Sequence, residues 1–94
     1  MTNFKKSDLQ YTHYDWTADD ENDNAKIIGF PDNKLLARNE GYEVLPYINR
    51  YMDHRNWKQL TSFHKIETAI KDDLPGTTRQ HDKVRDWLDK NVNI

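Results

Sequence analysis

The chain has 94 residues, of which 35% are hydrophobic, 12% aromatic and 32% charged, and its formal net charge is −2. A chain of this length forms one small domain, residues 1–94, in which aromatic side chains must supply much of the buried area. The absence of cysteine excludes disulfides, thiolate nucleophiles and cysteine-ligated zinc.

The charge is distributed unevenly along the chain. Residues 1–33 carry three lysines and seven acids, a net charge of −4, whereas residues 34–94 carry eleven bases and nine acids, a net charge of +2. No long apolar run follows the two N-terminal lysines or occurs elsewhere, so we expect neither a secretory signal nor a membrane span. The sequence therefore predicts a soluble, cytoplasmic protein, with residues 1–8 as a flexible tail.

Two short strands are predicted in the N-terminal third. Residues 9–16, LQYTHYDW, are rich in aromatic and β-branched side chains, which is typical of a strand. Residues 26–30, KIIGF, predict a second strand that ends at a Pro-Asp-Asn turn. The acidic stretch between them, DWTADDENDN, predicts an exposed and mobile loop over residues 17–25.

The acidic stretch partly matches the ligand pattern of a calcium-binding loop. Counted from Asp19, the first, third and fifth positions are Asp19, Glu21 and Asp23, as an EF-hand requires. The twelfth position is Phe30, so the carboxylate that would close the site is missing. We therefore predict that the loop binds no stoichiometric cation. The acidic side chains could instead be neutralised by the mildly basic C-terminal part of the chain or by a basic partner.

The first of three predicted helices covers about residues 39–54. Asn39 can cap it, and an apolar stripe with helical spacing follows, consisting of Val44, Ile48, Tyr51 and Met52. Pro46 removes a backbone donor, which predicts a kink or a regular helix that begins only near Leu45.

The second and third helices are predicted at about residues 61–73 and 78–91. Thr61 or Ser62 is the expected cap of the second, while Thr77 and Gln80 fit a capping box for the third. Their apolar stripes are Phe63, Ile66, Ile70 and Leu74 in the second, and Val84, Trp87, Leu88 and Val92 in the third. Together the elements predict an α+β fold, a short N-terminal β element followed by three helices; a helical bundle with an irregular N-terminus is the alternative.

The chemistry of known active sites is not found in the sequence. The four histidines fall on separate predicted elements, the two serines lie in the predicted tail and at a helix cap, and the three glycines are isolated. No triad, zinc-binding helix or phosphate-binding loop matches this pattern. We predict a non-enzymatic protein with no metal site and no cofactor.

Aromatic residues are the strongest functional signal. Tyrosine and tryptophan are enriched at protein interfaces, and this chain has more of them than a small core can enclose. Tyr42, Tyr51 and Trp87 are expected in the core, and a candidate interface is formed by Tyr14, Trp16, Tyr47 and Trp57. The favoured hypothesis is a small interaction protein that binds another protein or forms a homodimer.

DNA binding is the alternative hypothesis. The second and third helices, joined by a Pro-Gly turn, have the outline of a helix-turn-helix, in which the start of the second member reads bases. The residues at that start are Thr78, Arg79, Gln80 and Lys83. The same helix carries three aspartates and the whole chain is acidic, which opposes phosphate binding.

Overall fold

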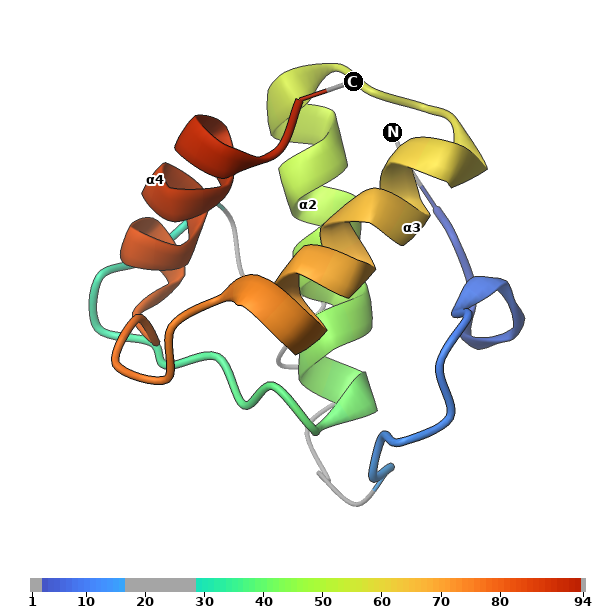
Figure 1. Cartoon of the computed structure of the whole chain (residues 1–94), viewed down its shortest axis with the longest axis horizontal. Coiled ribbons are helices and arrows are strands. Elements are labelled where there is room, and N and C mark those ends of the chain that lie inside the picture. The colour runs from blue at the N-terminus through green and yellow to red at the C-terminus, as the bar shows by residue number, and fades with distance from the viewer. Residues whose placement is uncertain (1–2, 17–28, 94) are drawn as a thin grey trace.

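The computed structural model describes residues 3–16 and 29–93, and this part of the chain is mostly helical. A 3-10 turn, η1 (Lys6–Asp8), precedes three α-helices, and a π-helical turn continues the second of them. The elements in chain order are η1, α2 (Gly41–Arg55), α3 (Leu60–Thr68), η2 (Ala69–Asp73) and α4 (His81–Asn91). In Figure 1, α3 crosses α2, and α4 and the N-terminal segment flank this pair on opposite sides.

The predicted β element is wrong, because residues 3–16 and 29–93 contain no strand. Residues 9–16 form only an isolated bridge between Asp15 and Glu40, and residues 26–28 of the second predicted strand lie outside the described part. Strand propensity largely reflects packing on a half-buried surface. Here the amides of Gln10 and Tyr11 bond to a side chain of α3, so the segment packs on helices without a partner strand.

Helix α2 begins earlier than its proline suggested. The N-cap is Glu40, not Asn39, and its side chain accepts a hydrogen bond from the Tyr42 amide at 3.2 Å. The Gly41 amide donates to the Asp15 carbonyl at 2.8 Å, which satisfies another amide at this end. Pro46 therefore lies inside a helix that starts at Gly41, and the predicted start near Leu45 is wrong.

The predicted caps of the other two helices are also wrong. Helix α3 starts at Leu60 after Gln59, and the expected cap Ser62 is buried within the helix. Helix α4 starts at His81, and Gln80 makes no side-chain cap bond. The late start of α4 is explained by residues 34–36, which pair with residues 79–81. The Leu36 amide donates to the Arg79 carbonyl at 2.7 Å, and the His81 amide donates to the Lys34 carbonyl at 2.9 Å. This pairing keeps residues 79 and 80 extended.

The end of the second helical segment is held by Arg38. The chain widens into the π-turn η2, in which the Leu74 amide donates to the Ala69 carbonyl at 2.8 Å. The Arg38 guanidinium donates to the carbonyls of Leu74 at 2.6 Å and Lys71 at 3.0 Å. The last carbonyls of a helix need such donors, and the proline at position 75 cannot continue the helix.

The apolar stripes predicted for the three helices meet in one core. Tyr51 of α2 and Leu88 of α4 are both fully buried, as expected, whereas Trp87 is only partly buried against this core. The buried apolar residues are Tyr14, Leu36, Val44, Tyr47, Ile48, Tyr51, Met52, Phe63, Ile66, Ala69, Ile70, Leu74, Val84, Leu88 and Val92. None of the helices in the described ranges combines the length and apolar character needed to cross a membrane.

Residues 3–8, part of the segment predicted as a flexible tail, contact α2 and α3. The Phe4 amide donates to Asn49 Oδ1 at 2.9 Å, and Asn49 Nδ2 donates back to the Phe4 carbonyl at 3.0 Å. The Phe4 ring lies 4.7 Å, centroid to centroid, from that of Phe63 in α3. These contacts place residues 3–8 against the helices; the predicted loop 17–25 lies outside the described residues.

Candidate functional site

The fold does not bring the four residues predicted as a protein interface together. The Tyr14 and Trp16 rings meet, with centroids 6.2 Å apart, whereas Tyr47 lies within α2 and Trp57 follows that helix. Tyr47 is fully buried and Tyr14 is 9% exposed, so neither has much side-chain surface to offer a partner. Trp16 and Trp57 are partly buried. They lie at opposite ends of α2, since Trp16 contacts Gly41 and Trp57 follows the last residue of the helix by two positions.

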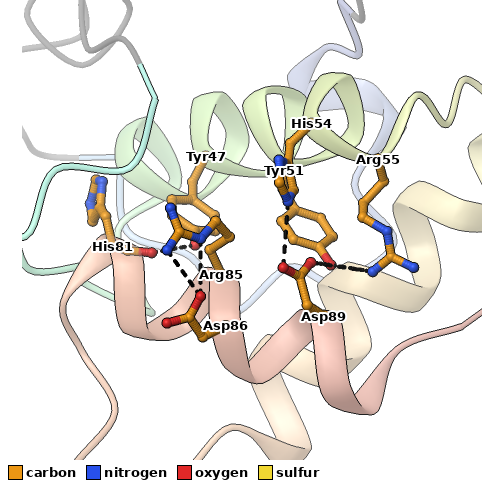
Figure 2. A network of polar contacts seen from close by, with 8 residues as sticks. All are labelled: Tyr47, Tyr51, His54, Arg55, His81, Arg85, Asp86 and Asp89. Carbon is orange, nitrogen blue, oxygen red and sulfur yellow. Dashed lines mark hydrogen bonds and ion pairs between the residues drawn. The ribbon is translucent and has the colours of Figure 1, made fainter.

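Tyr47 joins α2 to the start of α4. Its hydroxyl donates to the His81 carbonyl at 2.8 Å, and burial raises the pKa of this hydroxyl (Figure 2). The buried His81 ring lies with Nδ1 3.3 Å from Nη2 of Arg50. Burial, together with the charges of Arg50 and Lys34, lowers the pKa of His81 to about 4, so the ring is neutral at pH 7 and Nδ1 accepts the hydrogen bond.

A second polar cluster joins α2 to the later part of α4. The Tyr51 hydroxyl donates to Asp89 Oδ1 at 2.7 Å and accepts from Arg55 Nη1 at 2.8 Å (Figure 2). Burial and the bond to Asp89 raise the pKa of Tyr51. Burial opposes ionisation of Asp89, but the hydrogen bonds from Tyr51 and His54 and the charges of His54 and Arg55 outweigh it and lower its pKa. The cluster fixes how α4 lies on α2.

This second cluster contains a histidine beside a carboxylate, which is an arrangement found in catalytic sites. His54 Nε2 lies 3.5 Å from Asp89 Oδ2. A triad also needs a nucleophile next to the histidine. The two serines of the chain, Ser7 in η1 and the buried Ser62 in α3, lie on other elements. The contacts of Asp89 with Tyr51 and Arg55 join α4 to α2.

Glu67 of α3 is an important residue that sequence reasoning missed. Its carboxyl group is fully buried and accepts bonds from the Gln10 amide at 3.0 Å, the Tyr11 amide at 3.4 Å and the Tyr14 hydroxyl at 2.8 Å. Burial and this bond raise the pKa of Tyr14. The signal in the sequence is its position: Glu67 follows Phe63 by four residues and so shares the apolar face of its helix.

The segment held by Glu67 leads to Trp16, which forms the base of an open hollow. The indole lies directly on Gly41, where an added Cβ would stand 2.5 Å from the ring atom Cζ2. The Trp16 and Tyr42 rings meet edge to face, with centroids 5.1 Å apart. The hollow has a volume of about 440 Å³, and we call it the Trp16 groove. It is lined by Asn3, Phe4, Lys5, Lys6, Trp16, Tyr42, Leu45, Pro46 and Asn49.

A second hollow is lined mainly by the N-terminal segment. It has a volume of about 350 Å³ and shares the lining residues Lys6 and Trp16 with the groove. The Lys6 ammonium lies 4.3 Å from the centroid of the Trp16 ring, in a cation–π contact between these two shared residues. The remaining residues of this second hollow are Ser7, Leu9, Tyr11, Thr12 and Tyr14.

Trp57, at the other end of α2, has a different environment. The guanidinium of Arg55 lies 4.2 Å from the centroid of its ring, and the same guanidinium contacts Asp89 at 3.3 Å. A face of Trp57 is therefore covered by the Arg55 guanidinium, which also pairs with Asp89 of α4. Leu60 is 42% exposed at the start of α3, but neither Trp57 nor Leu60 lines a hollow among those described here.

The residues predicted to contact DNA lie only partly at the start of a helix, since Gln80 is the N-cap of α4 and Lys83 lies in its first turn. Thr78, Arg79 and Gln80 precede α4, and only Lys83 lies within it. The connection from η2 to α4 takes residues 74–80, which is longer than the three- or four-residue turn of a helix-turn-helix. Arg79, Gln80 and Lys83 are exposed, so DNA binding stays a prediction, but the geometry differs from the motif that suggested it.

No metal centre is formed within residues 3–16 and 29–93: no three histidine, aspartate or glutamate side chains there come close enough to hold an ion. His64, for example, has Nε2 2.8 Å from the Asp8 carbonyl oxygen and so attaches η1 to α3. Comparisons with protein-family models, with curated proteins and with solved structures gave no match to this chain.

Proposed function

We propose that this chain is a non-catalytic interaction protein that binds another protein through the Trp16 groove. The observation that carries the proposal is the contrast between two sets of aromatic residues. Tyr14, Tyr47 and Tyr51 are buried in the core, whereas Trp16 and Tyr42 remain partly exposed around an open hollow of about 440 Å³. Aromatic side chains that line an accessible pocket are the usual anchors of a protein interface.

The composition of the Trp16 groove supports the same conclusion. Leu45 and Pro46 project from one turn of α2 beside Tyr42, and all three are partly exposed. Polar groups of Asn49 and of the lysines border this apolar surface. An apolar centre with a polar rim is the usual arrangement of an interface, and a hollow of this size accommodates a few side chains of a partner.

The groove is held in place by bonds on both sides. Asn49 clamps the backbone of Phe4, and Glu67 binds the amides of Gln10 and Tyr11. A binding site that is ordered before the partner arrives loses less conformational entropy on binding. The polar clusters join α2 to α4 within the fold, whereas the groove presents partly exposed aromatic and apolar side chains.

The proposal can be tested with one groove variant and one control variant. Leu45→Glu places a charge on the apolar wall of the groove, and Leu60→Glu makes the same change at an exposed site on α3. Tagged proteins would be used to capture partners from a lysate of the source organism, and sedimentation of each pure protein would report self-association. Circular dichroism would establish that both variants fold.

We expect the wild type and Leu60→Glu to capture the same partner and Leu45→Glu to lose it. If sedimentation instead shows a dimer that only Leu45→Glu dissociates, the partner is a second copy of the chain. Equal capture or association by all three proteins would contradict the proposal, because the groove would then not be the interface.

A further inference from the structure

Two hollows that share lining residues could hold neighbouring parts of one extended chain. The Trp16 groove, about 440 Å³, and the second hollow, about 350 Å³, are both lined by Lys6 and Trp16. The first extends to Asn49 on α2 and the second to Tyr11, so the combined surface follows the N-terminal segment. An extended peptide can place one side chain in each hollow, because alternate side chains point to the same face of its backbone.

The described residues of this surface carry positive charge, although the protein as a whole is acidic. Among residues 3–16 and 29–93, those that line the two hollows include Lys5 and Lys6, and none of them is a carboxylate. Both lysines are exposed, and no ion pair within the described ranges includes either of them. The nearest acid in the sequence, Asp8, accepts a bond from the Lys5 backbone amide at 2.7 Å, so its carboxyl group already has a local role.

The position of Lys6 determines where a negative charge would bind. Its ammonium lies 4.3 Å from the Trp16 ring centroid, and Lys6 lines both hollows. The comparable stacked cation at the other end of α2, Arg55 on Trp57, is already paired with Asp89. Lys6 can therefore accept a carboxylate from a bound segment and remain stacked on Trp16.

From this arrangement we infer that the groove binds an extended acidic peptide segment of a partner protein. A large apolar side chain of the peptide enters the hollow beside Leu45 and Tyr42, and a neighbouring aspartate or glutamate pairs with Lys6. This inference rests on the proposed function, since it names the class of partner that the groove accepts. Because the charge pairs are exposed, the affinity falls as the salt concentration rises.

The test uses two synthetic peptides with the same phenylalanine and leucine anchors, one with aspartate and glutamate between them and the other with lysine. Binding to the whole chain is measured by calorimetry, and the contacted residues are located by backbone and indole NMR shifts. The charge-reversed protein is Lys5→Glu with Lys6→Glu. Its matched control is Lys58→Glu with Lys90→Glu, which makes the same change in net charge at exposed positions outside both hollows.

We expect the acidic peptide to bind and to shift the signals of Trp16 and Tyr42. The reversal at Lys5 and Lys6 should weaken binding at least about tenfold, whereas the control reversal should leave it nearly unchanged. Equal binding of the two peptides, or equal loss in the two charge-reversed proteins, would overturn the inference. If neither peptide binds while Leu45→Glu still abolishes partner capture, the acidic-peptide inference fails and the proposed function stands. If Leu45→Glu also has no effect, both fail.

Discussion

The Tyr14 hydroxyl donates a 2.8 Å hydrogen bond to the carboxyl group of Glu67, 53 positions later in the chain. The same carboxyl group accepts the backbone amides of Gln10 and Tyr11, and no part of its side chain is exposed. One buried acid of α3 thus holds the segment that leads to Trp16. The position of residues 10–14, which precede Trp16, therefore depends on this carboxyl group.

Replacement of Glu67 tests that dependence. Glu67→Ala leaves three buried or partly buried donors without their acceptor, and we expect the free energy of unfolding to fall by about 2–3 kcal/mol. Tyr14→Phe removes one of the three bonds and should cost about 1 kcal/mol. Urea unfolding followed by tryptophan fluorescence measures both. A loss in Glu67→Ala no larger than that in Tyr14→Phe would show that the two backbone bonds contribute little.

The contact between Trp16 and Gly41 gives a second prediction. Gly41→Ala would place a methyl group 2.5 Å from the indole, so the ring must move, and we expect a cost of about 1–3 kcal/mol. The NMR signal of the Trp16 indole should shift with it. Gly76→Ala is the control, because an added Cβ there meets nothing within 4 Å, and its stability should change by less than about 0.5 kcal/mol. Similar behaviour of the two variants would contradict the close approach.

Two aspartates of α4 give a third, paired prediction. Asp89 accepts from the Tyr51 hydroxyl and contacts Arg55, both of α2. Asp86 pairs with its neighbour Arg85, its only ion-pair partner among the described residues, and its side chain is 52% exposed. Asp89→Ala should lower the free energy of unfolding by about 1–2 kcal/mol. Asp86→Ala should change it by less than about 0.5 kcal/mol. Thermal or urea unfolding at neutral pH measures the difference, and equal effects would show that the Tyr51 bond adds no stability.

The sequence predicted the helices much better than their ends. The apolar stripes that contain Ile48, Phe63 and Val84 repeat with the period of a helix, and this pattern can be read from the sequence alone. All three residues are buried. The caps depend on partners from elsewhere in the chain. Pairing of residues 34–36 with residues 79–81 displaced the expected start of α4, and no local pattern contains that information.

The N-terminal segment and the candidate site also depend on contacts between residues that are distant in the sequence. Residues 9–16 have strand propensity, but the amides of Gln10 and Tyr11 donate to the carboxyl group of Glu67 and not to a partner strand. Trp16 was predicted as an interface residue, whereas the groove around it combines residues from the start of the chain with Leu45 and Asn49 of α2. Its existence follows from tertiary contacts such as the Asn49–Phe4 clamp, which a sequence pattern does not reveal.

His81 predicts how stability depends on pH. Its pKa is about 4 in the folded chain, lowered first by burial and then by the charges of Arg50 and Lys34, against an ordinary value of 6.5. The unfolded chain therefore binds a proton below pH 6.5 that the folded chain excludes until about pH 4. The stability that His81 contributes is complete above pH 6.5 and decreases as the pH falls toward 4, by about 2 kcal/mol between about pH 7.5 and about pH 5.

Urea unfolding across this range, for the wild type and for His81→Phe, isolates the contribution of His81. Phenylalanine keeps a ring against Tyr47, which meets the His81 ring edge to face at 5.0 Å, but it cannot take up a proton. The charge of Asp82 acts on His81 in the direction opposite to burial, Arg50 and Lys34, and all other ionisable groups are the same in the two proteins. We expect the free energy of unfolding of the wild type to fall more steeply with acid than that of the variant. Parallel curves would show that the folded chain accepts the proton on His81 as readily as the unfolded chain does, and the arrangement of Arg50 beside a neutral imidazole would then be wrong.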